Sequence, residues 1–109
     1  MNNYKFFFFL IFFLNITEVK AINLEAGEKI FQTNCMVCHA NGNNLIIPEK
    51  NLKKETLEIN GMNTLTAISY QVSNGKNGMP AFSERLTENE IEEVSYYVLF
   101  QSFKNFEKN

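Results

Sequence analysis

Histidine, cysteine and tryptophan are scarce in this chain of 109 residues, which has one histidine, two cysteines and no tryptophan. Structural zinc sites usually take four ligands, arranged as two pairs of cysteine or histidine residues. The sequence has no second pair, so a zinc ion would have to recruit glutamates. The low count therefore weighs against zinc and raises the question of what this small set of residues binds.

Positive charge is not in excess either. The chain has ten lysine and arginine residues against twelve acidic residues, all of them glutamates, and its formal net charge is −2. Proteins that bind nucleic acids present a basic patch on their surface. The composition therefore gives no support for a nucleic-acid partner.

Long hydrophobic runs are limited to one, residues 6–14 near the N-terminus. This run is too short to span a bilayer, which takes roughly 20 apolar residues. A lysine precedes the run and the small residue Ala21 follows it, which is typical of a secretory signal peptide. We therefore predict that residues 1–21 are a cleaved signal peptide and that residues 22–109 form one domain without a membrane span. An uncleaved leader that anchors the chain stays open as an alternative.

Strand patterns are absent, because apolar residues do not alternate with a period of two over any useful length. Apolar residues at helical spacing occur instead in residues 24–38, 52–59 and 64–73. The clearest helix start is Thr87-Glu88-Asn89-Glu90, a capping box in which the first and last residues satisfy each other's free backbone N–H groups. An apolar stripe follows it from Ile91 onward. The sequence therefore predicts an all-α fold.

The two cysteines and the histidine lie together in Cys35-Met36-Val37-Cys38-His39. The pattern C-x-x-C-H is the signature of covalent c-type haem attachment. Two thiols at this spacing can add to the two vinyl groups of one porphyrin, and the adjacent histidine can then bind the iron. A thioredoxin-like dithiol would need a strand–helix–strand pattern around the motif, which is absent. We therefore predict one haem c, which would also stabilise a domain of marginal size.

The sixth ligand of the iron decides the function, because a methionine makes an electron carrier whereas an open position permits ligand binding or catalysis. Met36 lies inside the motif and cannot reach the opposite face of the haem. Met62 and Met79 remain as candidates. Met79 is preferred because it stands in a glycine-containing loop before Pro80, which favours an extended backbone at Met79.

Four segments carry a resemblance to a known family: GEKIFQTNCMVCHANGNN, IPEKNLKKETLE, MNTLTAISYQVSNGKNGMPAF and YYVLFQS. Together they resemble the cytochrome c6 family, the small class I c-type cytochromes of algal and cyanobacterial thylakoid lumens. The resemblance covers essentially residues 22–102. It implies a class I cytochrome c fold, in which a few helices surround the haem and the first helix crosses the last.

The resemblance also implies a role for each site residue. Cys35 and Cys38 would form the thioether bonds, His39 would be the proximal iron ligand and Met79 the distal one. Gln71, in the matching YQV segment, would lie against the haem and tune the potential of the iron. An ordinary polar position on a helix is the alternative interpretation of Gln71.

The function that the resemblance implies is one-electron transfer without enzymatic activity, from the cytochrome b6-f complex to photosystem I. We expect a monomer in the thylakoid lumen of an algal plastid. Docking in the family uses the haem edge and a nearby arginine, which matches Arg85. The chain has Ser83-Glu84 where the family commonly has two glycines, so a plain exposed Arg85 stays open. Two rival functions also stay open: electron transfer to a respiratory or periplasmic partner, and ligand binding or peroxidase activity at a five-coordinate haem.

Overall fold

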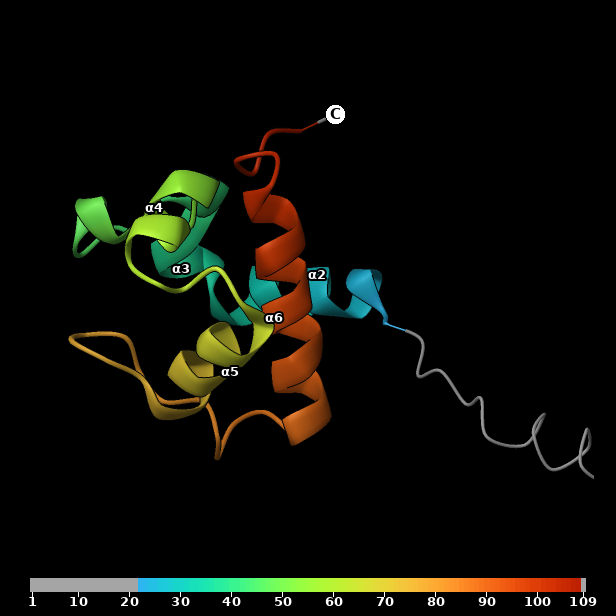
Figure 1. Cartoon of the computed structure of the whole chain (residues 1–109). Helices are drawn as coiled ribbons and strands as arrows, with labels where there is room; N and C mark the ends of the chain where they lie inside the picture. The colour runs from blue at the N-terminus through green and yellow to red at the C-terminus, as the bar shows by residue number, and fades with distance from the viewer. Residues whose placement is uncertain (1–21, 109) are drawn as a thin grey trace, which may run out of the picture.

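The computed structural model describes residues 22–108, and among these residues it contains helices but no strands (Figure 1). The helices are α2 (Leu24–Asn34), α3 (Met36–His39), the 3₁₀ turns η1 (Ala40–Gly42) and η2 (Pro48–Lys50), α4 (Lys54–Ile59), α5 (Leu65–Asn74) and α6 (Glu88–Ser102). The predicted all-α fold is confirmed. The predicted signal peptide, residues 1–21, lies outside the described residues. Within residues 22–108, none of the helices combines the length and the apolar character that a membrane crossing requires.

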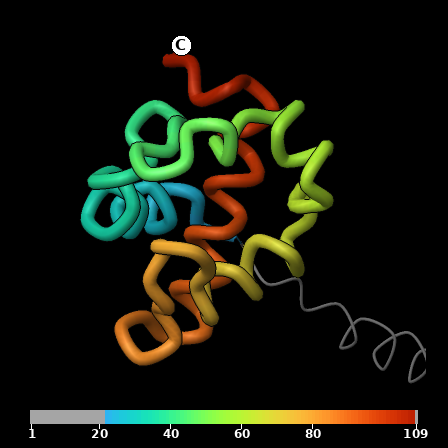
Figure 2. The backbone as a smooth tube through the Cα atoms, turned by 90° about the vertical axis from the view of Figure 1, so that its left-hand side faces the viewer, coloured from blue at the N-terminus to red at the C-terminus, as the bar shows by residue number. Residues whose placement is uncertain are grey.

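The C-terminal helix α6 organises the molecule, because α2 and α5 both pack against it (Figures 1 and 2). Its start is the predicted capping box, with the Thr87 hydroxyl 3.1 Å from the Glu90 N–H and the Glu90 carboxylate 2.9 Å from the Thr87 N–H. The buried apolar core draws on every long helix and on the loop before α6. Its members are Phe31, Leu57, Ile68, Val72, Phe82, Ile91, Val94 and Val98.

The crossing of α2 and α6 depends on Gly27. A Cβ atom at this position would lie 2.4 Å from the Glu93 carbonyl oxygen and 2.9 Å from the Cβ of Tyr97. Since real Cβ atoms do not come this close to backbone, only glycine lets the two helices approach to this distance. The crossing of the first and last helices that the resemblance implied is therefore present.

We expect Gly27→Ala to lower the free energy of unfolding by about 1–3 kcal/mol, the usual cost of overpacking a tight contact. In an uncrowded helix the same change would stabilise the fold by up to about 1 kcal/mol. The sign of the change in the free energy of unfolding therefore shows whether the site is crowded. Denaturant unfolding of the haem-loaded protein measures the difference. Thr33→Ala, at an exposed position of the same helix, serves as the control and should leave the stability near that of the wild type. A Gly27→Ala protein of wild-type stability would contradict this close approach.

The predicted helix over residues 24–38 is wrong in one respect, because Cys35 separates α2 from α3. The side-chain amide of Asn34 donates to the Ile30 carbonyl at 3.0 Å. Polar side chains that bond the backbone in this way favour helix ends over helix interiors. The break places the first cysteine at a turn between two helices.

Candidate functional site

The Cys35–His39 motif is wound into one tight helical turn after α2. The Cys35 N–H donates to the Phe31 carbonyl at 2.8 Å, and the His39 N–H donates to the Cys35 carbonyl at 2.8 Å. Both cysteines are partly buried and carry free thiols, so no disulfide joins them. The backbone therefore presents two thiols and an imidazole from a single turn.

The thiol of Cys35 is not activated for redox chemistry. Burial raises its pKa to about 11, with a smaller contribution from charge on Cys38. A catalytic dithiol instead needs a thiol whose pKa is lowered, because the thiolate is the nucleophile. This environment weighs against the dithiol interpretation of the motif.

The imidazole of His39 is oriented by the loop that follows it. Its Nδ1 atom lies 2.9 Å from the carbonyl oxygen of Asn43, so Nδ1 carries the proton in this contact and Nε2 is left as the ligating atom. Asn41 and Gly42 both have positive φ, 58° and 77°, which lets the loop turn back toward the histidine. Within residues 22–108, no cluster of three or more histidine, cysteine or acidic residues could hold a metal ion.

Met79 closes a tight hairpin turn. The backbones of Lys76 and Met79 exchange two hydrogen bonds of 3.0 Å each. The residues between them, Asn77 and Gly78, have φ of 45° and 91°. Positive φ at both central residues is typical of a type I′ turn, for which Asn-Gly is a preferred pair. The predicted loop is therefore present, and two backbone hydrogen bonds close it.

A second glycine fixes the base of this hairpin. A Cβ atom on Gly75, which has φ of 70°, would lie 2.5 Å from the Met79 carbonyl oxygen. Beyond the hairpin, the Phe82 N–H donates to the Val72 carbonyl at 2.9 Å and ties the chain back to α5. Met79 is thus held between the end of α5 and a buried phenylalanine.

Gln71 is brought directly to Met79. Its side-chain amide nitrogen lies 3.6 Å from the Met79 sulfur, within hydrogen-bond range for a sulfur acceptor. Gln71 is half-buried on α5, next to the buried Val72. This contact favours a specific polar role over an ordinary surface position.

The loop after His39 and the Met79 hairpin meet at one place. A Cβ atom on Gly78 would stand 3.6 Å from the side chain of Ile46, which is ordinary contact distance. Two segments more than thirty residues apart in sequence thus border the same region. The structure therefore brings the histidine loop and the methionine loop together.

The residues of this region fit a covalently bound haem. The donor set consists of two unpaired thiols, an imidazole with one free nitrogen and a thioether. Large apolar side chains around the motif and its following loop are left exposed by the protein alone. They are Met36, Val37, Leu45 and Ile46, of which Val37 and Leu45 are 78% and 75% exposed. A haem has a large apolar macrocycle, against which such side chains could pack.

Arg85 and Met62 are the two remaining candidate residues from the sequence. The Arg85 guanidinium lies over the ring of Phe82, 5.4 Å from its centroid, and the residue is exposed. Among the described residues, no ion pair joins Glu84 to Arg85. Met62 is partly buried against the core, and its N–H donates to the Leu57 carbonyl at 2.7 Å.

Three residues at this site were not predicted from the sequence. Asn43 supplies the carbonyl that orients His39, Gly42 shapes the loop, and Phe106 packs its ring against Gly42. The stretch Asn-Gly-Asn-Asn at residues 41–44 is typical of a turn, which is the signal that could have found the first two. Phe106 gave no signal, because it lies far away in sequence.

The chain matches the family model described as "Cytochrome C oxidase, cbb3-type, subunit III" over residues 22–98. It is 61% identical over 80 residues to cytochrome c6 of Bumilleriopsis filiformis, which spans 73% of this chain and 93% of that relative. The chain belongs to the cytochrome c6 family. Cytochrome c6 of Pyropia yezoensis is 54% identical over 101 residues, covering 93% of this chain and 90% of the relative.

A solved structure of cytochrome c6 from the diatom Phaeodactylum tricornutum superposes with a TM-score of 0.73 at 47% identity. The match covers 76% of this chain and 98% of the diatom protein. Membership in the cytochrome c6 family makes the protein a c-type cytochrome with one covalently attached haem c. It is an electron carrier of photosynthesis and not an enzyme.

Proposed function

We propose that the protein carries single electrons from the cytochrome b6-f complex to photosystem I in the thylakoid lumen of an algal plastid. In this proposal Cys35 and Cys38 would hold the haem through thioether bonds, and His39 and Met79 would bind its iron. Residues 1–21 direct export and are removed. The observation that carries the proposal is the Met79 hairpin, whose sulfur accepts a hydrogen bond from Gln71 and whose Gly78 lies beside Ile46 of the loop after His39.

Bound haem supplies an iron that alternates between its ferrous and ferric states. The task of the protein is to keep both ligands in place during that change. The Asn43 carbonyl fixes the ring orientation of His39 through Nδ1. The type I′ turn and the Gln71 amide restrict Met79 from two sides. Ligands that are held in this way need little rearrangement when an electron arrives or leaves.

Gln71 is proposed to tune the affinity of Met79 for iron. A sulfur that accepts a hydrogen bond has less electron density to donate, so the amide would weaken the binding of Met79 to iron without preventing it. Outer hydrogen bonds of this kind are a recognised means of setting haem potentials. The distance of 3.6 Å between amide nitrogen and sulfur supports this role.

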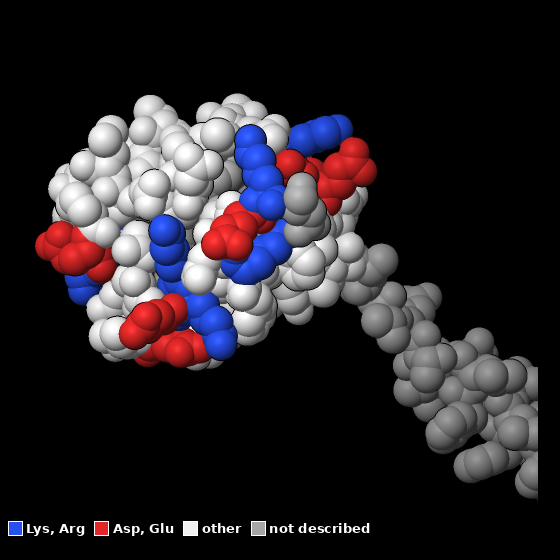
Figure 3. All heavy atoms as spheres, turned by 90° about the horizontal axis from the view of Figure 1, so that it is seen from above, with Lys and Arg blue, Asp and Glu red and all other residues white. Residues whose placement is uncertain are grey.

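The surface near the proposed site carries few charges, of which Lys76 on the Met79 hairpin is one. Residues 35–48 contain no lysine, arginine or glutamate, and neither do residues 77–83. Figure 3 shows charged side chains of both signs gathered on part of the molecule and a broad area without either. Brief redox encounters use small interfaces. A weakly charged face suits such contacts, because it allows docking and release without strong attraction.

We expect fast reduction of photo-oxidised photosystem I by this protein in flash kinetics with isolated complexes. The second-order rate constant should change by less than about tenfold between low and physiological salt, because a weakly charged face gives little electrostatic steering. A respiratory oxidase is the control acceptor and should accept electrons slowly. Fast transfer to the oxidase and none to photosystem I would overturn the proposed partner.

Arg85 is proposed to contact the partner, and the chain offers a matched control for it. Arg85 lies over Phe82 at 5.4 Å, and Lys104 lies over Phe100 at 5.6 Å at the far end of α6. In the same flash experiment, Arg85→Gln should slow the reduction of photosystem I while Lys104→Gln should not. Equal effects of the two substitutions would contradict a contact between Arg85 and the partner, and would show that Arg85 acts only through the net charge of the protein.

A further inference from the structure

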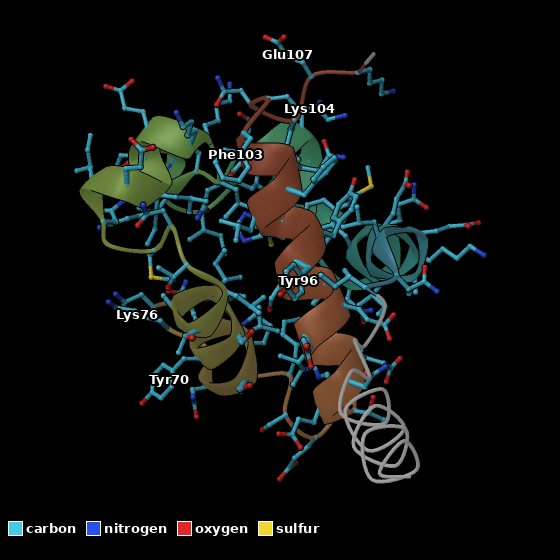
Figure 4. The ribbon with its side chains drawn as sticks, turned by 45° about the vertical axis from the view of Figure 1, so that its right-hand side comes forward. Tyr70, Lys76, Tyr96, Phe103, Lys104 and Glu107 are labelled. Carbon is cyan, nitrogen blue, oxygen red and sulfur yellow. The ribbon has the colours of Figure 1, made fainter. Side chains whose placement is uncertain are left out.

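After α6 the chain folds back toward the loop that follows His39. Asn105 donates to the Ser102 carbonyl at 3.0 Å, and Phe106 donates to the Gln101 carbonyl at 2.9 Å. With φ of 50° at Asn105, these are the two hydrogen bonds of a Schellman motif. We call residues 103–107 the C-terminal turn. Figure 4 shows Phe103, Lys104 and Glu107 beyond the end of α6, on the side of the molecule that also carries α4.

The C-terminal turn contacts α4 through Asn105. The side-chain oxygen of Asn105 accepts the N–H of Lys54, the first residue of α4, at 3.1 Å. The residue at the N-cap of α4, Lys53, provides no side-chain cap of its own. Asn105 therefore supplies from the other end of the chain the acceptor that a helix start requires.

The C-terminal turn contacts the loop after His39 through Phe106. The Phe106 ring packs beside Phe31, with the ring centroids 5.7 Å apart. It also covers Gly42, where a Cβ atom would lie only 2.5 Å from the ring. Phe106 itself has φ of 60°, a region that bulky residues rarely adopt unless their surroundings hold them there.

Gly42 is the link between this ring and the histidine. Its carbonyl accepts the Leu52 N–H at 2.7 Å, and the next residue is Asn43, whose carbonyl is 2.9 Å from His39 Nδ1. A shift of Gly42 would therefore move the oxygen that orients the imidazole. The Phe106 ring blocks such a shift where it packs on Gly42, and the Leu52 hydrogen bond also restrains Gly42.

We propose that Phe106 is a positioning residue for His39. By packing on Gly42 it keeps the Asn43 carbonyl within hydrogen-bond range of Nδ1, and so sets the orientation and the basicity of the ligand. The inference rests on the proposed role of His39 as an iron ligand. A hydrogen bond from Nδ1 increases the electron donation of imidazole and favours the ferric state. A weaker bond therefore raises the reduction potential.

The test measures the reduction potential and the hydrogen-exchange rate of the His39 Nδ1 proton in the haem-loaded protein. In Phe106→Ala, the Nδ1 proton should exchange faster than in the wild type, because the Asn43 carbonyl would hold it less firmly. The potential should rise at the same time. Phe106→Leu keeps apolar bulk without the flat ring and should give a smaller change in the same direction. It also covers the case in which the alanine protein fails to fold.

The matched control is Phe103→Ala, which removes an exposed phenylalanine from the same C-terminal turn. It should leave both the potential and the exchange rate at their wild-type values. Phe106 variants that are less stable but keep both values would overturn the inference and leave Phe106 a purely structural residue. The proposed function fails separately, if the wild-type spectrum lacks the signature of histidine and methionine ligation.

Discussion

Replacing Met79 with alanine is expected to open the sixth position of the iron and to convert the protein from an electron carrier into a ligand-binding haem protein. The reduced variant should bind carbon monoxide rapidly, whereas the wild type should bind it little. Methionine ligation raises the potential of c-type cytochromes. The potential should therefore fall by at least about a tenth of the ~0.8 V over which axial ligands set it. Visible spectra and a redox titration measure both effects.

Met62→Ala is the matched control, because Met62 is the other candidate and is also partly buried beside the core. This change should lower the free energy of unfolding by about 2 kcal/mol, at the low end for the loss of a core methionine. It should leave carbon monoxide binding and the potential unchanged. The opposite result would make Met62 the ligand. In that case the Met79 variant would keep the wild-type properties, and the Met62 variant would bind carbon monoxide rapidly. Rapid carbon monoxide binding by the wild type would instead favour the five-coordinate alternative.

The predicted features that the structure contains, the capping box and the loop around Met79, have local causes. The capping box at Thr87 depends on residues three apart, and it forms as predicted. The loop around Met79 follows from Asn77 and Gly78, which adopt the positive φ that they favour. Both features can be read from a few adjacent residues, because the backbone conformation there is decided locally.

The parts that sequence reasoning missed depend on contacts between distant segments. Phe106 packs on Gly42, and Asn105 caps a helix that begins 51 residues earlier. Nothing near Phe106 in sequence distinguishes it from Phe103. Phe106 is nevertheless partly buried, whereas Phe103 is 66% exposed. The split of the first helix at Cys35 was missed because apolar spacing continues across the break. Such features require the path of the whole chain.

Replacing both Cys35 and Cys38 with serine is expected to abolish covalent haem attachment and, with it, the stable fold. A haem that is no longer tethered stabilises the protein only by mass action, by about 2.7 kcal/mol at a hundredfold excess over Kd. The protein alone leaves Val37 and Leu45 mostly exposed, and a domain of this size buries too little surface to tolerate that loss. Circular dichroism should show an unfolded chain, and denaturing extraction should release all haem.

A graded series separates attachment from folding. Each single serine variant should keep one thioether bond, so its haem should resist extraction while the visible spectrum shifts with the number of vinyl groups left intact. Val37→Thr is the control, because it keeps a branched side chain between the two cysteines and should attach haem normally. Haem that remains covalently bound in the double variant would require attachment elsewhere. It would overturn the roles proposed for both cysteines, whereas a folded double variant without haem would contradict only the dependence of the fold on the cofactor.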